Sequence, residues 1–202
     1  MFTGIVDGTG PVLEITDVPG GRRLRVGLPE EMARGLTLGG SVAINGCCTT
    51  AIHCDQTSFS CDLMEVTLEK TNLGEVEVGT PLNLERPMKL GDELGGHLVQ
   101  GHVDAVGTVT AVRELAASHQ VEIELPPDLV RYVVATGSIA INGVSMTVAR
   151  IHGHRLTVGI IPHTWQVTNF SALQPGSRVN LEVDMVGKYI EKMFPARFPA
   201  LP

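Results

Sequence analysis

The chain repeats itself once. Ser41-Val42-Ala43-Ile44-Asn45-Gly46 reappears 97 positions later as Ser138-Ile139-Ala140-Ile141-Asn142-Gly143. The same shift relates Asn83-Leu84-Glu85 to Asn180-Leu181-Glu182, and no gap is needed from residue 1 to about residue 87. A repeat of this length is too long for a solenoid unit. It predicts two homologous domains, joined by a connection rich in Gly and turn formers between Pro87 and Gly96.

Short alternating segments predict the fold of each half. Leu24, Val26 and Leu28 alternate with polar residues, and their equivalents Val121, Ile123 and Leu125 do the same. This period is typical of half-buried strands. Pro29 and Pro126 each open a short segment with early acidic residues, which indicates a helical turn. Many short strands with Gly-rich turns in fewer than 100 residues favour a small closed β-barrel in each half.

The end of the chain breaks the repeat. Hydrophobic residues there fall on one helical stripe that Pro195 bounds: Val186, Tyr189, Ile190, Met193 and Phe194. An isolated helix of about ten residues is unstable in water. Its apolar face is therefore expected to dock, either on its own barrel or on another subunit.

Composition excludes several classes of protein. The 202 residues are 43% hydrophobic and 18% charged, which argues against disorder. The net charge is −7 without a basic cluster, so nucleic acid is not an expected partner. We expect no membrane span and no signal peptide, because no long apolar run and no basic N-terminal lead occur. Four cysteines lack a C-x-x-C pair and are expected to be reduced thiols of a cytoplasmic protein: Cys47, Cys48, Cys54 and Cys61.

The two copies differ at positions that carry chemistry. Cys48 aligns with Ser145 and Ile5 aligns with His102, whereas a threonine is kept at positions 50 and 147. Two equivalent pockets suit two copies of one ligand or two similar ligands. A thiol and an imidazole that each occur in one copy only are the pattern expected if two identical molecules play unequal roles.

Each candidate residue has a structural alternative. Cys48 is either a buried inert thiol or a nucleophile, since a pKa of about 8.5 leaves a little thiolate at neutral pH. His102 is either a satisfied structural histidine or a proton shuttle. Asp184 ends a predicted strand, where it is either a base or a turn former.

His97 and His102 lack further ligands at suitable spacing, so we predict no metal. The Gly-rich residues 91–101 lack a phosphate-binding pattern, so no phosphate cradle is indicated.

Several motifs occur in a characteristic order along residues 1 to about 194. They are Met1-Phe2-Thr3-Gly4-Ile5-Val6, Asn45-Gly46-Cys47-Cys48, Gly95-Gly96-His97 with Gly101-His102-Val103-Asp104, Asn142-Gly143-Val144-Ser145, Ile161-Pro162-His163-Thr164 and Asp184-Met185-Val186-Gly187-Lys188-Tyr189. As a set, these motifs resemble riboflavin synthase of the alpha-chain type.

The resemblance implies an all-β fold of two tandem, homologous, six-stranded Greek-key β-barrels plus a C-terminal α-helix. The lumazine-binding barrels would span residues 1–90 and 97–184, and a trimerisation helix and tail would span residues 185–202. Three chains would associate through these helices, with each active site between barrels of two subunits. The implied reaction is the dismutation of two 6,7-dimethyl-8-ribityllumazine molecules to riboflavin and 5-amino-6-(ribitylamino)uracil, without cofactor or metal. Association with lumazine synthase is a further expectation.

The resemblance also assigns residues. The expected catalytic residues are Phe2, Cys48, His102 and Asp184. One lumazine is expected to contact Gly4, Ile5, Val6, Cys48, Thr49, Thr50, Asp62, Leu63, Met64, Glu65, Val66 and Thr67. The other is expected to contact Gly101, His102, Val103, Thr136, Ser145, Met146, Thr147, Ile161, Pro162, His163, Thr164, Trp165 and Gln166.

This chain departs from the family pattern in four places. Thr136 stands where the family often has Lys, and Asn142 where Asp is frequent; Thr49 and Met146 replace a common Leu. Two other classes remain to be compared. A non-catalytic lumazine-binding antenna protein would share the duplicated barrel but lack the thiol or the second pocket. A flavin-binding oxidoreductase domain would need a nucleotide-binding domain, for which two barrels leave no room.

Overall fold

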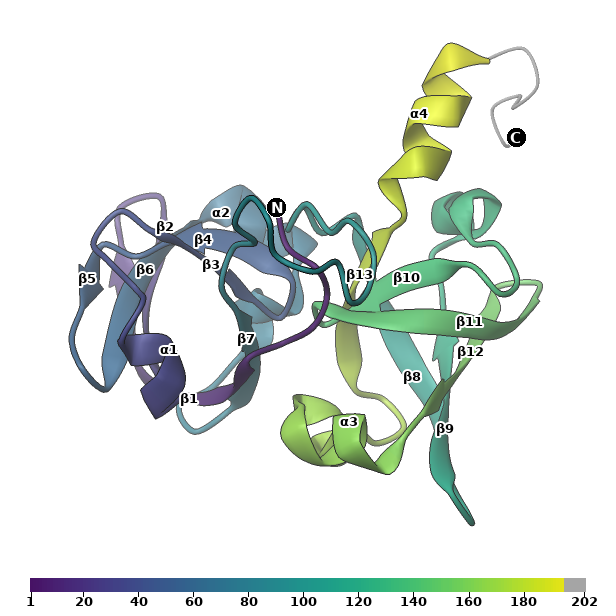
Figure 1. Ribbon diagram of the computed structural model, residues 1–202, viewed down its shortest axis with the longest axis horizontal. Helices are drawn as coiled ribbons and strands as arrows, with labels where there is room; N and C mark the ends of the chain where they lie inside the picture. Colours follow the sequence, from purple (N-terminus) through teal and green to yellow (C-terminus); the bar gives the residue numbers. More distant parts are fainter. Residues whose placement is uncertain (195–202) are drawn as a thin grey trace.

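Two β-barrels lie side by side in the computed structural model, which describes residues 1–194 (Figure 1). The expected tail over residues 195–202, with Pro195 as the helix end, lies outside the described residues. The all-β class with tandem barrels and a helix near the C-terminus is confirmed.

The N-terminal barrel contains seven strands in the order β4-β3-β7-β1-β2-β6-β5. Two short helices and a 3₁₀ turn accompany them. The elements are β1 (Gly8–Val18), β2 (Gly21–Gly27), α1 (Glu30–Ala33), β3 (Ser41–Ile44), β4 (Cys47–Thr50), β5 (His53–Cys54), β6 (Ser58–Met64), α2 (Glu65–Lys70), a 3₁₀ helix (Asn72–Glu75) and β7 (Pro81–Glu85).

The C-terminal barrel is closed by six strands in the order β10-β11-β12-β9-β8-β13. Neighbours such as β9 and β12 are not consecutive in the chain, as in Greek-key connections. The elements are β8 (Ala105–Leu115), β9 (Ser118–Glu124), a 3₁₀ helix (Pro127–Tyr132), β10 (Ser138–Ile141), β11 (Val144–His152), β12 (Arg155–Ile160), α3 (Pro162–Val167), a 3₁₀ helix (Asn169–Ala172), β13 (Arg178–Val183) and α4 (Met185–Met193).

The strand count differs between the barrels at one place. β4 and β5 together correspond to the single strand β11, and the break falls at Ala51 and Ile52. The N–H of Ile52 donates to the Ser60 carbonyl at 2.8 Å, so a backbone hydrogen bond still links the interrupted segment to β6. The six-stranded expectation therefore describes the C-terminal barrel directly and the N-terminal barrel with one strand divided.

The predicted alternation is confirmed in both cores. Leu24 and Val26 of β2 are fully buried, and Val121 and Ile123 of β9 are buried in the other barrel. Each barrel has its own hydrophobic cluster. By contrast, β7 and β13 bury both faces, because one face fills a barrel and the other meets the neighbouring barrel.

Six buried asparagines join the barrels in three pairs related by the 97-residue shift: Asn45 and Asn142, Asn72 and Asn169, Asn83 and Asn180. The Asn180 amide donates to the Asn45 carbonyl at 2.9 Å, and the Asn83 amide donates to the Asn142 carbonyl at 2.9 Å. Buried polar groups need such partners. The reciprocal bonds therefore fix the barrels about an approximate two-fold axis.

Two tight turns meet on this axis. Asn45 and Gly46 have φ values of 45° and 78°, and Asn142 and Gly143 have 45° and 80°. Positive φ at both central residues is the requirement of a type I′ hairpin. A Cβ on Gly46 would lie 2.7 Å from the Gly143 nitrogen, so the contact between the barrels also requires glycine.

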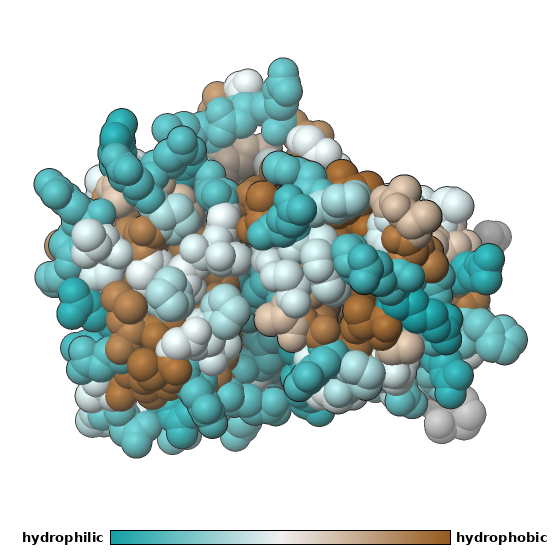
Figure 2. All heavy atoms as spheres, turned by 90° about the horizontal axis from the view of Figure 1, so that it is seen from below, coloured by the Kyte–Doolittle hydropathy of each residue, from teal (hydrophilic) through white to brown (hydrophobic). Residues whose placement is uncertain are grey.

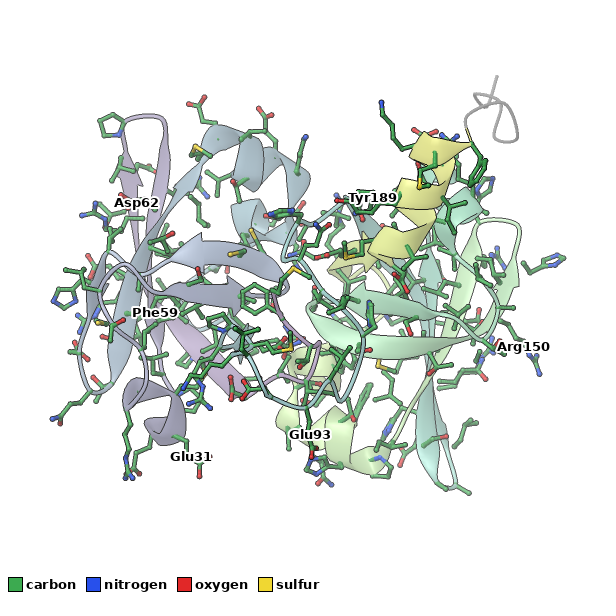
Figure 3. All side chains as sticks on the ribbon, turned by 45° about the horizontal axis from the view of Figure 1, so that its top comes forward. Glu31, Phe59, Asp62, Glu93, Arg150 and Tyr189 are labelled. Carbon is green, nitrogen blue, oxygen red and sulfur yellow. The ribbon has the colours of Figure 1, made fainter. Side chains whose placement is uncertain are left out.

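The C-terminal helix α4 projects away from its barrel (Figure 1). Polar contacts anchor it, since Glu191 accepts a hydrogen bond from Arg131 at 2.7 Å and another from the Tyr132 hydroxyl. The predicted stripe remains exposed by 43% to 69%, and Tyr189 can be followed in Figure 3. In the single chain, the apolar face is therefore not docked on its own barrel.

The remaining surface is mixed. In the view from below, hydrophobic residues lie in separate patches on both halves, bordered by polar residues (Figure 2). Among the described residues, no helix has the length and apolar character needed to cross a membrane. All four cysteines are free thiols.

Candidate active site

The segment before β1 crosses to the C-terminal barrel. We call residues 1–6 the first crossing segment. The N–H of Ser145 in β11 donates to the Gly4 carbonyl at 2.8 Å, and Val6 packs against the core of the C-terminal barrel. A Cβ on Gly4 would lie 2.6 Å from the Ser145 Cβ, so the close approach requires glycine.

The second crossing segment, residues 98–103, makes the reciprocal contact. The N–H of Cys48 in β4 donates to the Gly101 carbonyl at 2.8 Å, and Val103 packs against the core of the N-terminal barrel. The two segments pair where they pass each other: Phe2 donates to Val99 at 2.7 Å and Val99 donates to Phe2 at 3.1 Å. In Figure 1 the purple N-terminal segment runs between the barrels.

This exchange corrects the expected grouping of the site residues. Gly4–Val6 lie with Ser145 rather than with Cys48, and Gly101–Val103 lie with Cys48. The physical reason is the two-fold relation of the barrels, which lets equivalent segments exchange places without changing the pattern of the repeat. His102 therefore lies on the same barrel as Cys48, and Ile5 on the barrel of Ser145. The thiol and the imidazole, expected in different pockets, thus come from segments that lie on one barrel.

Two buried glutamates hold the crossing segments. Glu85 accepts hydrogen bonds from the backbone N–H of Thr3 at 2.7 Å and of Gly4 at 3.2 Å. Glu182 accepts from the backbone N–H of Gly101 and His102, each at 3.0 Å. Burial raises the pKa of Glu85 to about 7 and also raises the pKa of Glu182, while these hydrogen bonds act in the opposite direction.

On the N-terminal barrel, the thiol of Cys48 is exposed on the outward face of β4. The exposed side chain of His102 comes from the segment packed on it. The neighbouring Cys47 points inward, and burial raises its pKa to about 12. Cys48 is thus the one thiol of the four that is exposed, as a nucleophile must be, and the buried-thiol alternative does not apply.

The other expected residues of this barrel divide into outward and inward sets. Thr50 in β4, Met64 at the end of β6 and Val66 in α2 are exposed. Thr49 is buried and donates to the Val42 carbonyl at 3.0 Å, and the Leu63 side chain is buried in the core. The inward residues could meet a ligand only through their backbone. The expected residues of this barrel also include Asp62, whose carboxylate pairs with Arg23, and Glu65 and Thr67, which lie in α2.

On the C-terminal barrel, Ser145 and Thr147 take the outward positions of β11 while Met146 is buried in the core. Ile161 is exposed where β12 leads into α3. The Trp165 ring in α3 stacks on His119 with 3.9 Å between ring centroids. Pro162, His163 and Gln166 are exposed on the same helix, and Thr164 is half-buried.

Three further expected residues have structural roles in the chain. Phe2 is fully buried with Val99 and two alanines on the axis, so its side chain does not reach a pocket. Asp184 accepts the Val186 N–H at 3.0 Å and caps α4. Thr136 has a φ of 65° at the position equivalent to Gly39, a backbone conformation that favours glycine.

One residue has a contact at the candidate site that the sequence patterns did not predict. His97, considered only as a metal ligand, is 8% exposed and places its Nδ1 2.7 Å from the Ser145 Oγ. The 97-residue shift pairs His97 with no residue of the first copy. The Gly95-Gly96-His97 motif was the available signal. Within residues 1–194, no three His, Cys, Asp or Glu side chains come together as possible metal ligands.

A cavity of about 590 Å³ lies beside the first crossing segment. The loop before β3 and the linker after β7 form its other walls, and Glu93 marks the linker in Figure 3. Of the expected site residues, only Ile5 lines it. The remaining site residues thus lie outside this cavity, around two faces related by the repeat.

The lumazine binding domain family matches the chain twice, at residues 3–87 and 100–184. A riboflavin synthase of Mycobacterium tuberculosis is 41% identical over 197 residues, covering 96% of this chain and 98% of the relative. One from Escherichia coli is 38% identical, covering 100% of this chain and 97% of the relative. The chain belongs to the riboflavin synthase family. It is accordingly an enzyme of the transferase type.

Solved structures agree with the fold. The crystal structure of LumP complexed with riboflavin superposes with a TM-score of 0.85 at 28% identity, covering 91% of this chain and 99% of LumP. LumP complexed with 6,7-dimethyl-8-(1'-D-ribityl) lumazine gives a TM-score of 0.83 at 27% identity. The fold is therefore shared with ligand-binding relatives in which both barrels are present.

Proposed function

We propose that this enzyme catalyses the dismutation of two 6,7-dimethyl-8-ribityllumazine molecules, the last step of riboflavin biosynthesis. One molecule transfers a four-carbon unit to the other, which yields riboflavin and 5-amino-6-(ribitylamino)uracil. The observation that carries the proposal is the pair of equivalent faces with unequal chemistry. One presents the Cys48 thiol beside the segment of His102, and the other presents Ser145 with His97.

The substrate supplies much of the reactivity. Its electron-poor ring makes the C7 methyl acidic, so a modest base can remove a proton. The carbanion attacks a second lumazine that a nucleophile has activated at C7, and the nucleophile is water or Cys48. His102 is suited to carry the proton, since imidazole is the most frequent general acid and base in enzymes. Ser145 and Thr147 would hydrogen-bond the ring or the ribityl chain.

Positioning is the larger contribution of the protein. Holding two rings in reacting geometry can lower a barrier by roughly 7 to 11 kcal/mol. Acid–base assistance contributes about 10²–10⁴-fold, which corresponds to roughly 3 to 5 kcal/mol. Phe2 would act here as a positioning residue, because its backbone pairs the crossing segments and its ring lies against Gly101.

The proposed assembly is a homotrimer with active sites between subunits. The exposed stripe on α4 supports it, since Tyr189 and its neighbours would be covered by partner helices. In this arrangement, the N-terminal barrel of one subunit faces the C-terminal barrel of the next. A cytoplasmic location and association with lumazine synthase belong to the same proposal.

A non-catalytic lumazine-binding function is the second candidate, favoured by the structural similarity to LumP. The exposed thiol of Cys48 and the higher identity to riboflavin synthases support the enzyme instead. The deciding experiment incubates the protein with 6,7-dimethyl-8-ribityllumazine in EDTA without added cofactor. Appearance of the riboflavin absorption spectrum with one equivalent of the pyrimidine product is expected. Binding of the lumazine without any product would establish the antenna function.

A further inference from the structure

The contact between His97 and Ser145 is built by the linker as a whole. The His97 backbone N–H donates to the Thr3 carbonyl at 3.1 Å, which attaches the linker to the first crossing segment. A Cβ on Gly96 would lie 2.2 Å from the Thr3 oxygen and 2.7 Å from the Ser145 Cβ. Glycine therefore lets the linker backbone lie directly on Ser145, and the imidazole Nδ1 comes within 2.7 Å of its Oγ.

The charge state of this imidazole follows from its surroundings. Burial lowers the pKa of His97, while the carboxylate of Asp184 acts in the opposite direction. The neutral ring is therefore favoured at neutral pH, with one nitrogen as donor and the other as acceptor. Either tautomer leaves the Ser145 hydroxyl with one committed hydrogen bond. The direction of the other hydrogen bonds that the Ser145 hydroxyl can form is then set by the bond to His97.

We propose that His97 is a positioning residue that orients the Ser145 hydroxyl toward the lumazine bound on the C-terminal barrel. This inference rests on the proposed function and deepens it. The equivalent thiol of Cys48 is exposed and is held only through its backbone by the second crossing segment. One ligand thus meets an oriented hydroxyl and the other a free thiol. The difference assigns binding of a ring carbonyl or ribityl hydroxyl to the Ser145 side.

Two substitutions at one position separate orientation from packing. His97→Asn places an amide where Nδ1 lies and can keep the hydrogen bond to Ser145. His97→Leu keeps similar bulk and removes the hydrogen bond. Each is made in the wild-type chain and in a Ser145→Ala background. Quenching of Trp165 on addition of 6,7-dimethyl-8-ribityllumazine reports binding, because it is the only tryptophan in the sequence and belongs to the α3 segment expected to contact the same lumazine.

A neutral hydrogen bond contributes about 0.5 to 1.5 kcal/mol, so its loss weakens binding roughly 2- to 12-fold. We expect His97→Leu and Ser145→Ala to raise Kd and KM within this range, with a smaller effect on kcat. His97→Asn is expected to stay close to wild type. In the Ser145→Ala background, His97→Leu is expected to have no further effect, because the hydroxyl it orients is absent.

The outcomes distinguish the alternatives. An equal loss from His97→Leu with and without the serine would assign His97 a packing role and overturn the inference, as would unchanged binding in His97→Leu. If wild-type protein quenches but forms no riboflavin, the proposed function fails while the binding cycle still tests His97. The Asn variant keeps the test valid if the Leu variant does not fold.

Discussion

Replacement of Glu182 by Gln is expected to loosen the Cys48 side of the molecule although Glu182 belongs to the C-terminal barrel. The Glu182 carboxylate accepts backbone N–H groups of Gln100 at 2.7 Å and of Gly101 and His102 at 3.0 Å each. A glutamine keeps one acceptor oxygen and turns an NH₂ group toward an N–H donor. At least one of the three hydrogen bonds is lost, because the NH₂ group cannot accept from that N–H.

The structure sets the size of this effect. A buried donor left without its partner costs about 1 to 3 kcal/mol, so we take about 2 kcal/mol for the second crossing segment. That value corresponds to roughly 30-fold greater opening of the segment. For a chain of this length it lowers Tm by about 4 to 8 °C. Glu85→Gln is the matched control, since Glu85 holds the first crossing segment by equivalent bonds.

Amide hydrogen exchange at pH 5, read by mass spectrometry on local peptides, tests the expectation. Glu182→Gln should speed exchange in residues 98–104 and in residues 47–50, where the Cys48 N–H bonds to Gly101. Glu85→Gln should speed exchange in residues 1–6 and 143–147. If Glu182→Gln instead accelerates residues 143–147 and spares 47–50, each segment belongs to its own barrel, and the exchange of segments is refuted.

Four other outcomes are expected. Asn180→Ala should destabilise the protein by about 2 to 6 kcal/mol, because two buried backbone groups lose their partners; a urea midpoint like wild type would contradict this. Burial raises the pKa of Glu85 from 4.5 to about 7, so the folded chain holds this proton more tightly than the unfolded chain. Its stabilising contribution is complete below about pH 4.5 and is lost as pH rises through about 7, and the Tm difference from Glu85→Gln should shrink accordingly. Truncation before Val186 should leave folded barrels that sediment as monomers with little activity, whereas a trimer would exclude the helix as the interface. Cys48→Ala should reduce turnover far more than Cys54→Ala in steady-state assays; equal rates would remove Cys48 from the chemistry.

The repeat made most of the fold predictable. The alternation of Leu24 and Val26 recurs at Val121 and Ile123 in the second copy, so the two weak local patterns reinforce each other. The stripe through Tyr189 predicted the helix because a 3.6-residue period needs no partner to be recognised. The repeated Asn83 and Asn180 were visible too. A polar residue kept in a buried strand of both copies is the signal that would have indicated the interface between the barrels.

The arrangement of the candidate site was less predictable. An internal alignment equates Gly4 with Gly101, and it is unchanged if these residues exchange barrels. Only backbone contacts such as that between Cys48 and Gly101 reveal the exchange. The partner of Ser145 had no equivalent in the first copy, so comparison of the copies could not find His97. The role of Asp184, as a helix cap or as a base, could not be predicted from the strand pattern, because it depends on the residues that follow the strand.

The exchange of segments also affects how the protein is made. Residues 1–6 reach their final place only when Ser145 has been synthesised, about 140 residues later. Until then the nascent N-terminal barrel lacks the cover that Gly101 and Val103 provide, and Val6 has no core to enter. The N-terminal barrel is therefore completed only after the C-terminal barrel has been translated. A ribosome that stalls between them would release a chain whose hydrophobic residues and backbone groups lack their partners.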